Sequence, residues 1–566
     1  MKHKNIYFNK FKWLFLVMVL LAGTASVFAL IRTYFLSVVI DELIRQKGSD
    51  LLQNIICLLI LMFFLGQGIA YLVGYLNTYV TQEIAYDLRS RIVRKLNRMK
   101  ISRLQEMTSD HFVVSLTEDV GNVANLRCNY LVSLLNSAFT VLITVGLILY
   151  LDIQLALVSL LVIVVRVFFS VSFSKFAKKN QQDILENNTV HISFIKQIAT
   201  HMKYIRAYCT EGIMSGRYDG CSREISRLNY AAYLINYLFN HINSILDFIG
   251  SVIVFVLGVI AVYQNRISVG ILFVFDSVTG MLSGSMSGVV NIIISMIKAA
   301  VSDRRINDIL ATEEESRDGI ELDQEINEIS FSDVCFSYHD TKILDHFNYT
   351  FKKGCAYAVV GRSGIGKSTL ANMFLKYYDQ DSGEIKINNT KIQEISADSI
   401  RSRIALVFQE GIILANCSVR ENITLGNDVT DEQLERVVHA CHISDFADEL
   451  ENGLDTIVRE NGSNLSGGEK QRIYCARAML RNCDVYIFDE AFTGMDAALS
   501  AEMIRYIEGT LADKIVIIIS HDTNIIRRYE NIIAFEEDRH ISCGCHNELL
   551  MNSDNYRRFA EGDDKQ

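Results

Sequence analysis

The sequence predicts a multidomain membrane protein: a six-helix all-α transmembrane domain with long cytoplasmic helical extensions, followed by an α/β domain. Three observations predict this class. Half of the 566 residues are hydrophobic, and the long apolar stretches lie in the first 300. A glycine-rich segment, Gly361–Thr369, follows a short apolar run, and a second apolar run, Val485–Glu490, ends in two acids. A chain this long and apolar is neither a single domain nor a purely soluble protein.

Six apolar stretches are long enough to cross a bilayer, which takes about 20 helical residues each. They are Phe11–Leu36, Leu51–Tyr75, Leu131–Tyr150, Ile153–Phe173, Ile245–Tyr263 and Val269–Met296. Only Leu151-Asp152 separates the third stretch from the fourth, and only Gln264-Asn265-Arg266 separates the fifth from the sixth. We therefore expect both connections to be tight hairpins.

Basic residues predict the orientation of these spans. Lysine and arginine are concentrated before residue 13, in residues 77–130 and in residues 174–244, whereas the other connections are short and nearly neutral. By the positive-inside tendency the three basic segments face the cytoplasm. The first apolar run could instead be a secretory signal with Val27-Phe28-Ala29 as its cleavage site. That alternative is disfavoured, because it would leave five spans and place the basic loops outside.

The two long cytoplasmic segments are rich in helix formers, so we expect them to extend the membrane helices. Short lateral helices are expected near Lys100–Met107 and Ala207–Ile213, with ordinary loop as the alternative. Residues 301–325 are polar and acidic, without helical or strand periodicity. The predicted domains are residues 1–300 for the transmembrane domain, 301–328 for a linker and 329–566 for the α/β domain.

Charged residues inside the spans are costly against lipid, so Arg166, Asp247 and Asp276 should face the bundle interior or a cavity. Arg166 could instead snorkel to the cytoplasmic interface. Glycines recur every four residues over 280–288, a spacing that lets helices pack closely. Proline is absent from the whole chain, so no membrane helix can bend at proline.

The segment Gly361–Thr369 fits the phosphate-loop pattern G-x-x-x-x-G-K-[ST]. Its glycines let backbone N–H groups surround the phosphates of a nucleotide, and Lys367 reaches the terminal phosphates. Ser368 offers its hydroxyl to Mg²⁺, and the helix that starts there points its positive end at the anion. The residues expected to contact nucleotide here are Gly361, Ser363, Gly364, Gly366, Lys367, Ser368 and Thr369.

The apolar run Val485–Glu490 supplies the remaining groups for ATP hydrolysis. Asp489 would hold the metal, and Glu490 would orient and activate the attacking water. A lone histidine, His521, follows the run IVIIIS. The predicted catalytic residues are Glu490, His521 and Lys367, with ATP and Mg²⁺ as cofactors.

Between these motifs lies LSGGEKQR at Leu465–Arg472, which resembles the signature of the ATP-binding cassette family. The resemblance covers residues 329–550, so the α/β domain resembles the ATPase cassette of that family. The resemblance implies that Ser466, Gly467 and Gly468 cap the γ-phosphate of ATP held by an opposite cassette, so that two cassettes close around two nucleotides.

Further positions take their roles from the resemblance alone. Tyr338 falls where the family stacks an aromatic ring on adenine, and Gln409 at its metal-sensing, membrane-coupling glutamine. Asp496 falls in the loop that crosses between cassettes, and His521 at the histidine that contacts the γ-phosphate. Glu460-Asn461-Gly462 resembles the segment that touches the transmembrane half. The pattern departs from the family at Phe492, Gly494 and Met495, and glycine at 494 is expected to loosen the crossing loop.

Composition excludes other site classes. The twelve cysteines form no disulfide framework, and Cys543-Gly-Cys545 lacks the second pair or histidine spacing of a zinc site. The net charge of −10 argues against a nucleic-acid partner.

The resemblance implies a half-transporter that pairs with a second half-transporter subunit, in contact with membrane lipid. ATP-driven, alternating-access export of a peptide, a lipid or an amphiphilic compound is the leading hypothesis. An importer with the exporter fold, for example for siderophores, and an ATP-gated membrane protein that transports nothing remain alternatives. Six spans exclude a soluble ATPase of the DNA-repair type. The expected location is a bacterial inner membrane, with the cassette in the cytoplasm.

Overall fold

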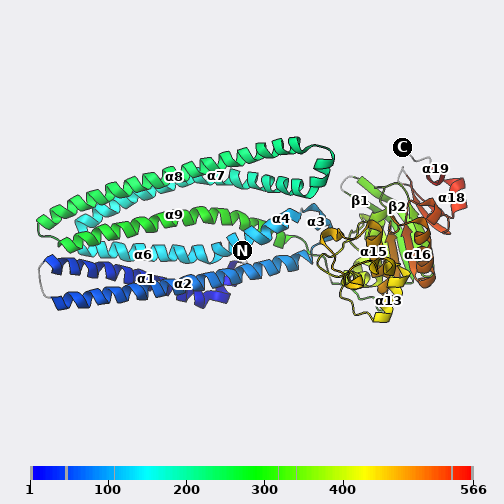
Figure 1. Cartoon of the computed structure of the whole chain (residues 1–566), viewed down its shortest axis with the longest axis horizontal. Helices are drawn as coiled ribbons and strands as arrows, with labels where there is room; N and C mark the ends of the chain where they lie inside the picture. The colour runs from blue at the N-terminus through cyan, green and yellow to red at the C-terminus, as the bar shows by residue number, and fades with distance from the viewer. Residues whose placement is uncertain are drawn as a thin grey trace. The chain divides into compact units, whose positions relative to one another are not determined.

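The computed structural model describes residues 4–44, 49–107, 109–316, 318–338, 341–536 and 540–561. Contacts divide the chain into two compact units, which we describe separately. One comprises Met1–Met99 and Leu104–Glu313 and is helical, and the other comprises Lys100–Arg103 and Glu314–Gln566 and contains all the strands described (Figure 1).

The helical unit consists of six long helices and a few short ones. Its helices are α1 (Lys4–Ile44), α2 (Ser49–Leu96), α4 (Ser109–Val114), a π-helical turn (Ser115–Asp119), α5 (Val120–Arg127), α6 (Asn129–Leu151), α7 (Ile153–Ala207), α8 (Glu211–Tyr263) and α9 (Val269–Ala311). The short helix α3 (Ile101–Glu106) is divided between the two units. Figure 1 shows the long helices running side by side, with α7 and α8 as a pair. A bundle of this kind is the all-α architecture that the sequence predicts.

Each predicted span lies in one of the six long helices. Within the described residues, five segments are long and apolar enough to cross a membrane, and they lie in α1, α2, α4–α6, α8 and α9. The predicted fourth span lies in α7, whose described apolar part covers only Ile153–Phe169. Length and composition thus support five of the six spans, and the fourth span, in α7, stays a prediction.

Both predicted tight hairpins are present. The α6–α7 turn is a single residue, Asp152, whose carboxylate accepts hydrogen bonds from the backbone N–H groups of Gln154 and Leu155 at 3.0 Å. These bonds cap the start of α7. Arg266, from the turn between α8 and α9, pairs with Asp152 and bonds Gln154 at 2.6 Å. The two turns are therefore held together.

One of the two predicted lateral helices is in the wrong place. The first is present as α3, but no separate helix covers Ala207–Ile213: Ala207 ends α7, residues 208–210 form the turn, and α8 begins at Glu211. The short crossing segment lies earlier: α7 breaks its helical geometry at His201 (φ −106°, ψ 18°), and residues 202–207 then lead across to α8 (Figure 1). The helix α9 likewise continues to Ala311, so the first residues of the predicted linker are helical.

Two of the three charged residues of the spans, Arg166 and Asp247, meet inside the helical unit. Arg166 of α7 is 4% exposed and pairs with Asp247 of α8. It also donates to Asn243 at 3.2 Å and to Ser287 of α9 at 2.8 Å. Arg166 and Asp247 therefore face neighbouring helices, as the cost of charge in lipid requires. Asp276 is exposed and accepts a hydrogen bond from Ser251 at 2.5 Å.

The second unit contains two sheets. The antiparallel sheet has the order β2-β1-β4-β5, with β1 (Glu328–Tyr338), β2 (Thr341–Lys352), β4 (Ser382–Ile387) and β5 (Thr390–Lys391). The other has the order β10-β9-β3-β8-β7-β6, with β3 (Ala356–Val360), β6 (Ile404–Val407), β7 (Val485–Asp489), β8 (Ile515–Ile519), β9 (Asn531–Phe535) and β10 (Ile541–Gly544). All its pairings are parallel except β9–β10.

Alternate residues of the six-stranded sheet pack into two separate cores. Phe488 and Ile518 lie in one core, and Ile487 and Ile517 in the other. A parallel strand buried on both faces reads as a continuous apolar run, which explains VYIF and IVIII. The helices are α10 (Lys367–Phe374), α11 (Ala397–Arg403), α12 (Val419–Thr424), α13 (Asp431–Ala440), α14 (Ile443–Ala447), α15 (Gly467–Leu480), α16 (Ala497–Thr510), α17 (Thr523–Ile526), α18 (His546–Asn552) and α19 (Asp554–Glu561).

Candidate nucleotide-binding site

Three neighbouring parallel strands end at the same edge of the six-stranded sheet. Strand β8 lies between β3 and β7, with Val359 and Asp489 both opposite Ile519. The segments that follow these strands therefore start side by side. They are the phosphate loop after β3, the two acids at the end of β7, and Ser520-His521 after β8. Ligands of open α/β sheets bind at this carboxyl edge.

The phosphate loop joins β3 to α10, and Gly366 is the residue before the helix. Its φ of +126° is open to glycine but strained for other residues. A Cβ there would also lie 2.4 Å from Ile343 Cγ2 of β2. The glycine thus permits both the turn and the close approach of β2, and the first N–H groups of α10 face the loop.

Lys367 is the first residue of α10 and is 6% exposed. Its ammonium group donates to the carbonyl oxygens of Gly361 at 2.7 Å and Arg362 at 3.0 Å. Burial lowers the pKa of this group, while Glu490 and Asp489 oppose that shift. The side chain is folded across the loop whose amides would hold phosphate, within reach of the same anion.

Asp489 ends β7 and is 4% exposed. Burial raises its pKa, as does the charge of Glu490, whereas a hydrogen bond with Ser368 and the charge of Lys367 lower it. Its Oδ1 atom is buried and has no hydrogen-bond partner. A carboxylate with a buried, unpaired oxygen beside a serine hydroxyl is a donor set that fits Mg²⁺.

Glu490 follows directly and has a φ of +48°, in the left-handed region that non-glycine residues rarely adopt. Its N–H donates to the carbonyl of Ile519 at 3.0 Å. Its carboxylate accepts a hydrogen bond from Gln409 Nε2 at 2.7 Å and lies 3.7 Å from His521 Nδ1. The unusual backbone angle lies directly after β7, and Asp489 and Glu490 have different surroundings.

Glu490 and His521 line one cleft of about 440 Å³, together with Thr493, Gly494 and Met495. The predicted water-activating residue and the predicted γ-phosphate contact are thus neighbours. The loop predicted to cross between cassettes forms another wall of the same cleft.

Ser466 precedes the fourteen-residue helix α15 and is exposed. Its hydroxyl accepts from the N–H of Glu469 at 3.3 Å, and its own N–H donates to the Glu469 carboxylate at 3.0 Å. This is a capping box. Gly467 is exposed as well, and a Cβ on Gly468 would lie 3.1 Å from the Gly494 carbonyl. Glycine at 468 therefore lets the signature helix approach the crossing loop.

Asp496 caps the next helix, α16, by accepting a hydrogen bond from the N–H of Leu499 at 2.8 Å. Gly494, two residues earlier, has a φ of +84°. Of the other departures from the family pattern, Phe492 is buried in a core and stacks on Phe488, while Met495 packs against the same core.

Tyr338, at the end of β1, is half-buried beside the phosphate-loop helix. It forms hydrogen bonds with Thr369 and Tyr378, and its ring lies edge-on to Tyr378, with centroids 5.1 Å apart. Burial, followed by the hydrogen bond with Tyr378, raises the Tyr338 pKa. The predicted adenine contact is therefore placed next to a predicted phosphate-loop residue.

Sequence reasoning did not single out two residues that position this site. Gln471, inside the signature motif, donates to the Gln409 backbone carbonyl at 3.0 Å, and Tyr378 positions Tyr338. The position of Gln471 within the motif LSGGEKQR could have identified it as a site residue. Tyr378 lies forty residues from Tyr338 and carries no local signal.

Two family profiles match the chain. One, described as ABC transporter transmembrane region, matches residues 14–286, and the other, described as ABC transporter, matches residues 344–493. The chain belongs to the ABC transporter family. It combines the membrane region and the ATP-binding region of that family in one polypeptide.

Relatives align with this chain over nearly the whole length of both. An ATP-dependent lipid A-core flippase of Syntrophus aciditrophicus is 26% identical over 96% of this chain and 91% of its own. The flippase of Desulfotalea psychrophila is 28% identical, with 93% and 92% covered. A putative export ATP-binding/permease protein of Rickettsia bellii is 26% identical, with 98% and 97% covered.

The fold matches that of a bacterial Atm1-family ABC exporter solved with ATP bound. The TM-score is 0.84 at 19% identity, and 99% of each chain is covered. This ABC transporter is therefore an integral membrane protein of the exporter fold that binds ATP and couples its hydrolysis to transport.

Proposed function

We propose that the chain is one half of an ATP-driven exporter in a bacterial inner membrane, with its cassette in the cytoplasm. The observation that carries this proposal is the group at the carboxyl edge of β3, β7 and β8. Lys367 and the unpaired oxygen of Asp489 lie there beside Glu490. A binding module without turnover would not need a carboxylate placed to activate water.

Each residue of the site has its own role in ATP binding and hydrolysis. The N–H groups of the phosphate loop and the ammonium of Lys367 bind the phosphates, and Tyr338 contacts the adenine. Glu490, held by Gln409, orients the attacking water and accepts its proton, and His521 contacts the γ-phosphate. Ser368, Asp489 and the amide oxygen of Gln409 would hold Mg²⁺, which when bound neutralises phosphate charge.

A second copy or a related half-transporter completes each site. Support comes from Ser466 and Gly467, which are exposed at the N-terminus of α15. A helix N-terminus with free N–H groups suits a phosphate group presented from outside the chain. Asp496 and the crossing loop would contact the same partner, and ATP held between two cassettes would favour the closed state.

Co-expression of two inactive chains tests this arrangement. One carries Lys367→Ala and the other Ser466→Arg, and each alone should have little ATPase activity. If Ser466 acts on the partner's nucleotide, the mixed dimer has one site with both defects and one intact site, so activity returns in part. If each chain completes its own site, both sites of the mixed dimer are defective and no activity returns.

The transported compound is proposed only by class. The relatives named lipid A-core flippases favour an amphiphilic lipid, with peptides and amphiphilic drugs as further candidates. Purified protein in lipid vesicles should hydrolyse ATP faster with its substrate, and Glu490→Gln should reduce turnover by at least about 100-fold. Uptake into inside-out vesicles would support export, whereas movement in the opposite direction would favour the importer. Hydrolysis without movement of any tested compound would favour an ATP-gated protein.

A further inference from the structure

Strands β1 and β2 of the cassette have three register shifts in their pairing, and the first two are successive β-bulges on opposite strands. Phe331 of β1 pairs with Tyr349 of β2, but Val334 pairs with Phe347, which leaves one extra residue on β1. Phe336 then pairs with Leu344, which leaves one extra residue on β2. A bulge changes the direction in which side chains leave the strand.

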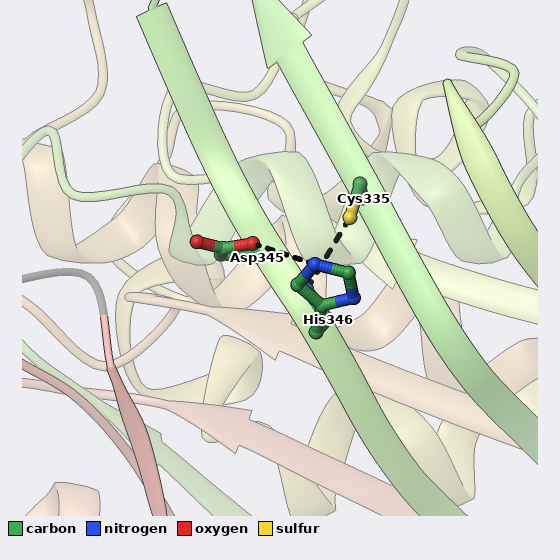
Figure 2. Close-up of side chains that lie close together, drawn as sticks. All are labelled: Cys335, Asp345 and His346. Carbon is green, nitrogen blue, oxygen red and sulfur yellow. Dashed lines mark hydrogen bonds and ion pairs between the residues drawn. The ribbon is translucent and has the colours of Figure 1, made fainter.

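The second bulge places two consecutive residues of β2, Asp345 and His346, opposite Cys335 of β1. In a regular strand, consecutive side chains point to opposite faces. Here His346 has a φ of +50°, and both side chains lie near Cys335. Figure 2 shows the three side chains converging from β1 and β2.

The atoms that gather here are metal ligands of three kinds. One ligand atom each from Cys335, Asp345 and His346 lies within 4.8 Å of the other two. His346 Nε2 is 3.6 Å from Asp345 Oδ1, and the backbone N–H of His346 donates to Cys335 Sγ at 3.4 Å. A thiolate, an imidazole and a carboxylate with an open fourth side suit Zn²⁺ and similar divalent transition metals rather than Mg²⁺ or Ca²⁺.

The other bulge supplies a residue that orients the imidazole. Asp333, with a φ of +54°, has its Oδ1 atom 2.6 Å from His346 Nδ1. This contact leaves Nε2 directed toward Asp345. Histidines that bind metals usually donate their second nitrogen's proton to such a carboxylate.

We propose that Cys335, Asp345 and His346 form a surface binding site for a divalent transition-metal ion of the zinc class, with Asp333 positioning His346. Lys342 is the competing cation, because its ammonium lies 2.5 Å from Asp345 Oδ1. Metal binding must therefore displace Lys342 from that carboxylate.

The test is Co²⁺ binding to the full-length protein after chelator treatment, followed by optical absorption. We expect one Co²⁺ per chain, a thiolate-to-cobalt charge-transfer band, and displacement by Zn²⁺. Cys335→Ser should abolish the band, and His346→Asn should weaken binding at least tenfold. Cys543→Ser is the matched control and should change nothing, because Cys543 lies on β10.

Two further variants separate ligation from general damage to the sheet. Asp333→Asn should weaken binding about tenfold while keeping the charge-transfer band, since it acts through His346. Lys342→Met should tighten binding severalfold, which a merely disrupted sheet would not do. Binding well below one Co²⁺ per chain, or a band that survives Cys335→Ser, overturns the proposal. None of these readouts depends on ATP hydrolysis.

Discussion

Gln409 Nε2 lies 2.7 Å from Glu490 Oε2, so an amide from the end of β6 already holds the carboxylate proposed to activate water. The Gln409 backbone is held in turn by Gln471 of the signature helix, at 3.0 Å. Glu490, Gln409 and α15 are therefore joined by two successive hydrogen bonds. A displacement of the signature helix would be transmitted to the catalytic carboxylate.

Substitution of Gln409 by alanine should lower the rate of ATP hydrolysis without abolishing ATP binding. A hydrogen bond to a charged group contributes about 1.5–3 kcal/mol, and its loss here affects the orientation of Glu490 rather than its chemistry. We expect kcat to fall about tenfold in vesicles, measured by phosphate release, with nucleotide affinity nearly unchanged. Gln409→Glu should lower kcat further than Gln409→Ala, because it places a second negative charge beside Glu490.

Substitution of Gly494 by alanine should destabilise the cassette. The φ of +84° lies where a Cβ costs about 1–2 kcal/mol. Each kcal/mol lowers Tm by about 2–4 °C in a domain of this size. Thermal unfolding of the nucleotide-free protein measures the change.

The matched control is Gly509→Ala in α16, where a Cβ would meet no atom within 4 Å. Glycine inside a helix costs about 0.5–1 kcal/mol relative to alanine, so this substitution should raise Tm. If Gly494→Ala also raised Tm, the positive φ would not be the conformation in solution.

The sequence was sufficient to predict structure where a functional motif also has a recognisable local pattern. The runs VYIFD and IVIII predict buried parallel strands, and the phosphate-loop glycines predict the turn before α10. The juxtaposition of Gln409 with Glu490 could not be read locally, since it depends on β6 lying beside β7 in the sheet. The bulges that bring His346 to Cys335 carry no glycine or proline signal.

The position of the second lateral helix was also predicted wrongly because the sequence carries no local signal for it. A chain without proline offers few signals for helix ends, and nothing at His201 marks the break in α7. The charged residues of the spans were correctly expected to avoid lipid in the case of Arg166 and Asp247. Their mutual pairing depends on the register of α7 against α8, which packing sets.

Substitution of Arg166 by methionine should destabilise the helical unit, because Asp247 and Asn243 lose their shared partner. Asp247→Asn alone should also destabilise it, and the double variant should lose less than the sum of the two. Residues in one hydrogen-bond network typically show coupling of about 0.5–3 kcal/mol. Thermal unfolding of the four proteins in detergent gives this coupling. Additive losses would mean that the pair contributes nothing beyond its separate residues.

Substitution of Asp489 by asparagine should stabilise the protein when nucleotide and Mg²⁺ are absent. Burial raises the pKa of Asp489 above 3.8 in the folded state, so the folded state binds the proton more tightly than the unfolded state does. The contribution of this group to stability is full below pH about 3.8 and is lost as the pH rises through the folded-state pKa. At pH 7 the ionised carboxylate, with its buried Oδ1 atom unpaired, opposes folding, and the neutral amide removes that cost.

The measurement is Tm against pH in a chelating buffer, with and without Mg²⁺-ATP. The variant should exceed wild type at pH 7, and the difference should shrink toward pH 4. Addition of Mg²⁺-ATP should reverse the order, because only the carboxylate gains a metal. Asp484→Asn is the control from the opposite end of β7: that buried carboxylate lies 3.6 Å from Lys514 Nζ and 3.4 Å from Arg403 Nη1. Its loss removes a buried carboxylate from two cations and should lower Tm. A fall in Tm for Asp489→Asn at pH 7 without Mg²⁺ would show that the Asp489 carboxylate stabilises the fold, as that of Asp484 does. It would contradict a role of Asp489 as a metal ligand that is destabilising without its cation.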